Sequence, residues 1–186
     1  MTIRHDSPIL IICALKVEAA GIVHALKLSS HKICNVPVFL SDRIYCAIPG
    51  IGSASIRKKV PSLIECIQPR TILNVGSAGA LNQSITKGMM YEITRVIQID
   101  QNASPSEPIE IEAGTPFPTA SLATSRKPVV KDDERQSLGI HADLVDMEGY
   151  AIAGIARARN IPVHIIKIVS DVATENDENA IRHAII

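Results

Sequence analysis

Seven consecutive apolar residues run from Ile9 to Leu15. A strand that is apolar at every position has both faces covered, as in the centre of an α/β sheet. Residues 17–28 follow with apolar side chains at helical spacing. Because Lys16 and Glu18 end the run, which is too short to cross a bilayer, we expect neither a membrane span nor a cleaved signal peptide.

The alternation of short apolar runs with helical segments continues along the chain. Further strands are predicted at 43–48, 71–75, 91–99, 119–123, 128–130 and 161–169, and helices at 53–67, 147–159 and 177–185. Residues 100–118 predict an irregular loop, and the charge run 131–135 the solvated start of a helix. This order predicts an α/β fold with a mixed or largely parallel sheet.

Length and charge favour a small-molecule partner. The 186 residues, 46% of them hydrophobic, suit a single domain spanning 1–186. Nineteen Lys and Arg balance nineteen Asp and Glu, so no positive field for nucleic acid is expected. Cys13, Cys34, Cys46 and Cys66 sit among apolar neighbours and form no CxxC pair. We therefore expect small buried side chains, no disulfide framework, no metal or other cofactor, and a reducing compartment, the cytoplasm.

The polar and glycine-rich segments of this apolar chain follow its predicted strands. In open α/β sheets, ligands bind beyond the carboxyl ends of the strands. The segments at these positions are Glu18, Gly50-Ile51-Gly52, Gly76-Ser77-Ala78-Gly79, Met147-Glu148 and Ser170-Asp171. We expect a ligand site where they meet.

Each segment also has an ordinary structural explanation. Gly50-Ile51-Gly52 lacks the third glycine of a dinucleotide fingerprint, which favours a tight turn. Gly76–Gly79, after a strand, fits a turn or a backbone cradle for an oxygen-rich ligand equally well. Glu148 at a helix start and Asp171 at a strand end are common as caps. No segment alone decides the function.

Taken together, the segments resemble the purine nucleoside phosphorylase/nucleosidase family. The resemblance rests on Asn74–Gly79, Val145–Glu148 and Ile168–Ala173, with Ala14–Glu18 and Gly50–Gly52 at the first strand ends, and covers about residues 9 to 176. It is closest to the nucleosidases that act on methylthioadenosine and adenosylhomocysteine. It implies a three-layer fold in which helices flank a central mixed β-sheet.

The resemblance also implies roles for the site residues. Asp171, supported by Ser170, would protonate N7 of the purine, which requires a neutral carboxyl group at a pH well above its ordinary pKa. We expect burial to raise that pKa. Met147 and Glu148 would hold the ribose, and Glu18 would act on the attacking water. Ser77, Ala78 and Gly79 would line the pocket close to that water.

Two positions favour water over phosphate as the nucleophile. Phosphorylases bind phosphate through arginine, and hexameric-type members carry one two residues before the glycine of the Gly-Ser element. Asn74 occupies that position, and residues 16–24 offer Glu18 in place of a second arginine. Lys167 fills a strand position that is often arginine in the family. Hydrolysis of the N-glycosidic bond is the resulting prediction.

The segment that would contact the base departs from the family. Lys127-Pro128-Val129 stands where these nucleosidases stack an aromatic ring on adenine and read its edge with backbone groups. Val129 is the expected base contact, with Phe117 or Tyr150 as aromatic candidates from elsewhere. The 5′ substituent of the substrate is left open, and futalosine is a further candidate.

Two alternatives to a hydrolase remain at this point: a phosphorylase with an unusual phosphate site, and a non-catalytic module that binds nucleosides. The resemblance also implies a homodimer, in which Phe117 and the 100–118 loop could complete the neighbouring pocket.

Overall fold

The computed structural model describes residues 7–99 and 104–171. Within these ranges the chain forms four helices and ten strands, and all ten strands belong to one sheet. In chain order they are β1 (Ile9–Ile12), α1 (Lys16–Ala25), β2 (Ser29–Ile33), β3 (Val36–Ser41), β4 (Ile44–Ala47), α2 (Ser53–Ile67), β5 (Thr71–Ala80), β6 (Met90–Gln98), β7 (Ile109–Glu110), β8 (Thr119–Thr124), α3 (Asp132–Gly139), β9 (Leu144–Asp146), α4 (Gly149–Ala158) and β10 (Val163–Asp171).

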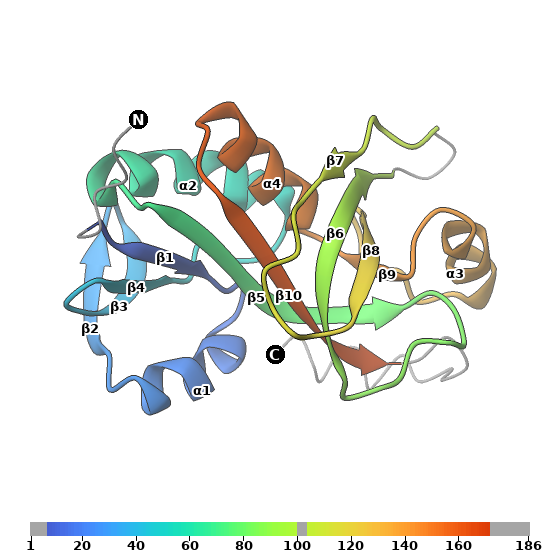
Figure 1. The fold of residues 1–186 in the computed structure, drawn as a ribbon, viewed down its shortest axis with the longest axis horizontal. Helices are drawn as coiled ribbons and strands as arrows, with labels where there is room; N and C mark the ends of the chain where they lie inside the picture. The colour runs from blue at the N-terminus through green and yellow to red at the C-terminus, as the bar shows by residue number, and fades with distance from the viewer. Residues whose placement is uncertain (1–6, 100–103, 172–186) are drawn as a thin grey trace.

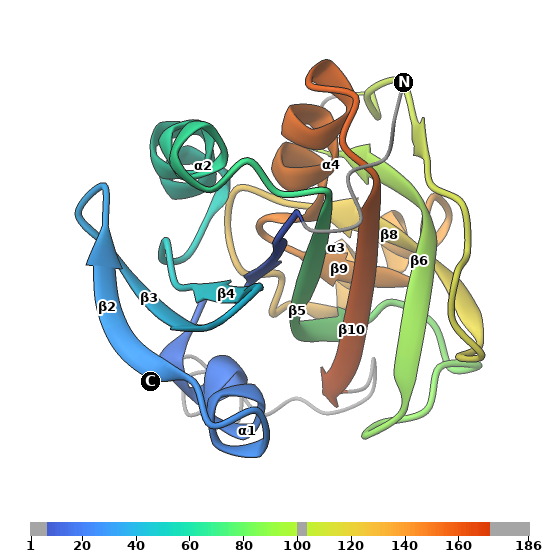
Figure 2. The same ribbon diagram turned by 60° about the vertical axis from the view of Figure 1, so that its left-hand side comes forward.

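The sheet closes on itself at one end. Its order is β10-β6-β8-β9-β5-β1-β4-β3-β2, and β10 also pairs with β5. These pairings join β5, β10, β6, β8 and β9 into a ring, from which β1, β4, β3 and β2 extend (Figures 1 and 2). Because β10 runs parallel to β5 but antiparallel to β6, the sheet is mixed, as predicted.

Helices cover both faces of the sheet and confirm the expected layers. α2 and α4 lie together on one face, and α1 lies on the other (Figures 1 and 2). Helical spacing puts Ile56, Val60 and Leu63 of α2 on one stripe, each fully buried, against Leu10 of β1 and Ile72 of β5. The predicted bounds of α2 agree with the structure.

The hairpin β2–β3 was not predicted. Cys34 and Asn35 form its two-residue turn, with φ of 49° and 61°. Such turns need two residues in the left-handed region, and Asn-Gly or Asp-Gly is their usual signature. β2 is also almost entirely exposed, so it carries no apolar alternation. The expectation that every cysteine is buried is wrong here, since Cys34 and Cys66 are exposed.

Several predicted boundaries shift. Gly76–Gly79 lies within β5, which continues to Ala80, rather than after a strand. Residues 128–130 form no strand, whereas Leu144–Asp146 form β9. The predicted loop 100–118 includes the short strand β7, and its residues 100–103, like the predicted helix 177–185, lie outside the described residues. No helix in the described ranges is long and apolar enough to span a membrane.

Candidate active site

One pocket contains every site residue predicted from the sequence. Its volume is about 110 Å³, and its walls come from the β1–α1 junction, the end of β5, the β9–α4 junction and the end of β10. The predicted residues among its lining are Glu18, Ser77, Ala78, Gly79, Val129, Met147, Glu148, Ser170 and Asp171. The three predicted carboxyl groups thus share one cavity, and Asp146 lines it as well.

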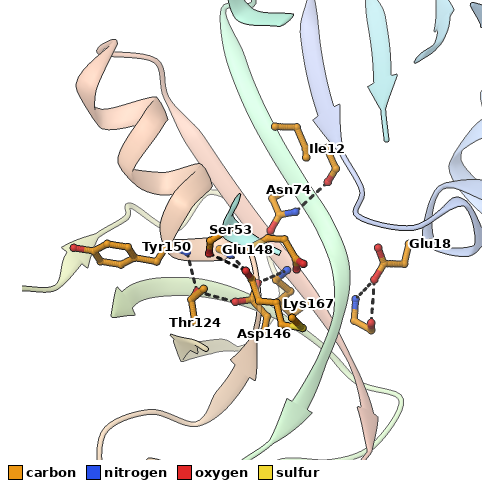
Figure 3. Close-up of polar contacts among 12 residues, drawn as sticks. Ile12, Glu18, Ser53, Asn74, Thr124, Asp146, Glu148, Tyr150 and Lys167 are labelled. Atoms are coloured by element: carbon orange, nitrogen blue, oxygen red, sulfur yellow. Dashed lines mark hydrogen bonds and ion pairs between the residues drawn. The ribbon is translucent and has the colours of Figure 1, made fainter. Parts of the chain in front are cut away.

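Glu18 stands in the first turn of α1, where the helix dipole favours an acidic side chain. Its Oε2 accepts a hydrogen bond from the Leu15 N–H at 3.0 Å. Its Oε1 accepts two from Ser77, the backbone N–H at 2.8 Å and Oγ at 2.9 Å (Figure 3). The Ser77 N–H, which the sequence suggested as a possible hydrogen-bond donor to a ligand, therefore binds the Glu18 carboxylate instead. Gly76 leaves room for it, since a Cβ there would lie 3.0 Å from Glu18 Oε1.

Glu148 is buried at the β9–α4 junction, opposite the N-terminus of α2. Its Oε1 accepts a hydrogen bond of 2.6 Å from the Gly52 N–H, and Ser53 Oγ donates to the Met147 carbonyl at 2.9 Å. Burial, together with the charge of Asp146, raises the pKa of Glu148 to about 7, against the opposing effects of Lys167 and the Gly52 N–H. The group therefore changes charge near neutral pH.

A buried ion pair supports the Met147-Glu148 segment. Lys167 Nζ lies 2.8 Å from Asp146 Oδ2, and the Lys167 side chain is 2% exposed (Figure 3). Burial penalises the ammonium, but the attraction of Asp146 and Glu148 outweighs this and raises the pKa of Lys167. Asp146 also accepts hydrogen bonds from Thr124 Oγ1 at 2.7 Å and the Gly149 N–H at 2.8 Å. Lys167 thus acts behind the pocket rather than in its wall.

Asp171 ends β10 and is 8% exposed. Ser170 Oγ donates to its Oδ1 at 2.6 Å. A register shift gives β10 one extra residue opposite β5, because Val169 pairs with Ala78 and Asp171 with Gly79. A Cβ on Gly79 would lie 3.2 Å from Asp171 Oδ2, so this glycine makes room for the carboxylate.

Arg135 is the functional residue that the sequence did not reveal. The charge run 131–135 predicts a solvated segment, yet Arg135 is 2% exposed and its guanidinium pairs with Asp171 Oδ2. A second nitrogen donates to the Ala80 carbonyl at 3.2 Å. The only hint in the sequence is Leu138, one helical turn later, which packs on the core. One carboxylate oxygen of Asp171 is thus bound to a cation that comes from a distant part of the chain.

The base segment Lys127-Pro128-Val129 lines the pocket, but no aromatic side chain does so in the part of the chain that the structure describes. Tyr150, one of the two aromatic candidates, instead donates through its hydroxyl to the Glu107 carbonyl at 3.3 Å. Phe117 is also absent from the lining. Asn74 lies in the sheet, where its Nδ2 donates to the Ile12 carbonyl at 3.0 Å (Figure 3). Among the described residues, no cluster of His, Cys, Asp or Glu could hold a metal ion.

Comparison with known proteins found similarity in part of the sequence to a family model and over most of the chain to individual proteins. Residues 111–185 match the model of the Phosphorylase superfamily. The 5′-methylthioadenosine/S-adenosylhomocysteine nucleosidase of Buchnera aphidicola is 26% identical over 198 residues, covering 87% of this chain and 80% of that protein. The protein of that name from Staphylococcus aureus strain NCTC 8325 is 26% identical over 200 residues, covering 90% and 88%.

Solved structures share the fold at lower identity. A Helicobacter pylori 5′-methylthioadenosine/S-adenosylhomocysteine nucleosidase superposes with a TM-score of 0.83 at 16% identity, covering 97% of this chain and 91% of that chain. Futalosine hydrolase of the same organism gives a TM-score of 0.79 at 16% identity, with coverage of 89% and 88%. The nucleoside phosphorylase-like α/β fold expected from the sequence is thereby confirmed.

Proposed function

We infer that this chain is a single-domain member of the phosphorylase superfamily, and we propose that it hydrolyses the N-glycosidic bond of a purine nucleoside. Support comes from its similarity to nucleosidases over most of its length. The observation that carries the proposal is the convergence of Glu18, Glu148 and Asp171 on one pocket. Each carboxyl group has different hydrogen-bond partners, which suits three different tasks.

Asp171 is proposed as the acid at N7. A purine anion is a poor leaving group, so the bond breaks readily only when the base is protonated. Ser170 fixes Oδ1 of Asp171, whereas Oδ2 faces Arg135. In the proposed reaction the purine N7 replaces the guanidinium at Oδ2. Once the guanidinium is displaced, Asp171 takes a proton from solvent and transfers it to N7 of the base.

Glu148 and Met147 are proposed to hold the ribose. In its charged form, the buried Glu148 carboxylate would accept hydrogen bonds from the 2′- and 3′-hydroxyls. Its negative charge would also stabilise the oxocarbenium-like sugar in the transition state. The Gly52 N–H and Ser53 hold this segment before substrate arrives, so little reorganisation is needed.

Glu18 is proposed to orient the attacking water. Three donors fix its carboxylate, which keeps its position rigid at the pocket wall. A carboxylate there repels phosphate, and Arg135, a cation in the lining, is paired with Asp171. These charges favour water over phosphate, although Lys127 also lines the pocket and leaves phosphorolysis as the outcome to test against.

Product analysis decides between the functions. We expect purified protein to release free base and free sugar from methylthioadenosine, adenosylhomocysteine, futalosine, adenosine or inosine, at a rate independent of phosphate. Ribose-1-phosphate that forms only with phosphate would establish a phosphorylase. Tight nucleoside binding by calorimetry without turnover would establish a binding module. Asp171→Asn is the matched control, because it should lose turnover but keep the fold.

We further propose a cytoplasmic homodimer. Val17, beside Glu18, is 63% exposed, and Ile51 in the pocket lining is 41% exposed. Apolar side chains at a pocket mouth are typical of a surface that another chain covers. Light scattering should give twice the monomer mass, and Val17→Asp should shift the protein toward monomer.

A further inference from the structure

Two cysteines far apart in the sequence meet at the surface. The Sγ atoms of Cys34 and Cys66 lie 2.9 Å apart. Cys34 belongs to the β2–β3 turn, and Cys66 to the last turn of α2. Cys34 Sγ also lies 3.7 Å from the carbonyl oxygen of Ser62, one turn earlier in α2. The hairpin turn therefore rests on one face of this helix, with the two sulfurs in contact.

The two thiols are accessible to reagents in solvent, unlike the remaining pair. Cys34 and Cys66 are exposed, whereas the side chains of Cys13 and Cys46 are fully buried. A bond between Cys34 and Cys66 requires their separation to shorten from 2.9 Å to about 2.05 Å. Movement of the exposed two-residue turn can supply this without disturbing the core.

We propose that Cys34 and Cys66 form a redox-active dithiol, which a low-molecular-weight disulfide of the glutathione type converts to an intramolecular disulfide. One protein thiolate attacks the added disulfide and expels the first small thiolate, leaving a mixed disulfide. The second protein thiolate attacks the protein sulfur of that mixed disulfide and expels the second small thiolate. The two cysteines lose two electrons and two protons, and the added disulfide is reduced to two thiols.

The bond would join the hairpin to the end of α2 that lies away from the pocket. Gly52 and Ser53, at the other end of α2, hold the Met147-Glu148 segment. Neither cysteine lines the pocket. Oxidation therefore stabilises the fold by reducing the conformational entropy of the unfolded chain, and the residues of the active site stay in place.

Peptide mapping after incubation of the folded protein with oxidised glutathione tests the proposal. We expect the Cys34 and Cys66 peptides to be cross-linked, without retained glutathione, and to separate again with dithiothreitol. The Tm of the oxidised protein should rise by roughly 5 °C or more. Cys13 and Cys46 are the internal control, because they should react only after denaturation.

Cys34→Ser and Cys66→Ser are the matched variants. Each should keep a stable glutathione adduct on its remaining exposed cysteine, since the second attack cannot occur, and should show no such rise in Tm. Stable adducts on both cysteines of the unmodified sequence would overturn the proposal. So would cross-links between two chains on non-reducing electrophoresis, or a lack of reaction in the folded state.

Discussion

The guanidinium of Arg135 pairs with Oδ2 of Asp171, the carboxylate oxygen that lies beside Gly79. The oxygen proposed to reach the purine N7 is thus bound to a cation of the chain itself. The pair is also buried, so separating the two side chains costs free energy, because water cannot fully solvate either charge there.

Replacing Arg135 by Met should therefore affect stability and activity in different ways. It leaves a buried carboxylate without its partner and should lower the free energy of unfolding by about 3 kcal/mol at neutral pH. Removing the guanidinium also frees Oδ2 of Asp171 for the purine, so KM should fall in a variant that stays folded. Thermal unfolding and steady-state kinetics measure both effects.

Arg135→Lys is the control for this experiment. It keeps the positive charge, so KM should stay close to that of the unmodified sequence while packing changes slightly. If Arg135→Met leaves KM unchanged in an active enzyme, the displacement of the guanidinium by the purine is wrong.

Activity should depend on the charge of Glu148. Burial raises its pKa to about 7, and only the carboxylate can accept hydrogen bonds from both ribose hydroxyls. We expect kcat/KM to fall about tenfold for each pH unit below that value. In Glu148→Gln, this acid limb should be missing and turnover low throughout. An unchanged acid limb in the variant would assign it to another group.

Stability should carry the opposite pH dependence at the same residue. The folded-state pKa of Glu148 lies above the ordinary value of a glutamate. Its contribution to folding is then fully present below the unfolded pKa of about 4.3, and is lost as pH rises through about 7. Glu148→Gln should remove this decline between about pH 4.3 and pH 7, measured by urea unfolding.

The contributions of Lys167 and Asp146 to stability should depend on each other. Lys167→Met leaves Asp146 charged and buried, at a cost of about 3–5 kcal/mol. The double variant Lys167→Met/Asp146→Asn should regain a large part of this loss, because no charge remains unpaired. Urea unfolding of both single variants and the double variant measures the coupling. Additive losses would contradict an interaction between the two residues.

Gly79 should be required for activity more than for folding. An alanine Cβ would lie 3.2 Å from Asp171 Oδ2, and the carboxylate must shift to accommodate it. We expect Gly79→Ala to lower kcat/KM at least tenfold, with little change in Tm.

Gly21→Ala in α1 is the matched control, since nothing lies within 4 Å of its new Cβ. It should keep full activity and gain up to about 1 kcal/mol of stability. Equal activities of the two variants would show that Gly79 does not shape the site.

The sequence predicted the parts of this fold that follow a regular apolar pattern. The helix predicted at 53–67 is α2, and the strand predicted at 161–169 covers most of β10. The sequence did not predict the β2–β3 hairpin, because Cys34-Asn35 is not a usual turn signature and β2 is exposed. The glycines of Gly76–Gly79 suggested a turn after the strand. In the structure they make room for the carboxylates of Glu18 and Asp171, which is a tertiary requirement that the local sequence does not reveal.

The residues of the candidate site also differ in whether the sequence could predict them. Glu18 and Asp171 follow predicted strands, and ligands of α/β sheets bind beyond strand ends, so the sequence alone predicted that these two carboxyl groups meet. Glu148 follows β9, which was not among the predicted strands, and its place in the site was expected from the family resemblance. Arg135 sits in a run of charges, and nothing local distinguishes its buried side chain from its solvated neighbours. Its role depends on the packing of α3 beside the end of β10, which only the assembled fold provides.

The ring formed by β5, β10, β6, β8 and β9 has a consequence for how the molecule is made. Its closing strand, β10, comes long after β5 in the chain, so during synthesis one edge of β5 waits without its partner. Contacts of such large sequence separation form slowly, and an unpaired edge invites association with other chains. Because Asp171 arrives on that same strand, the nascent chain acquires its proposed acid in the same step that pairs this edge of β5.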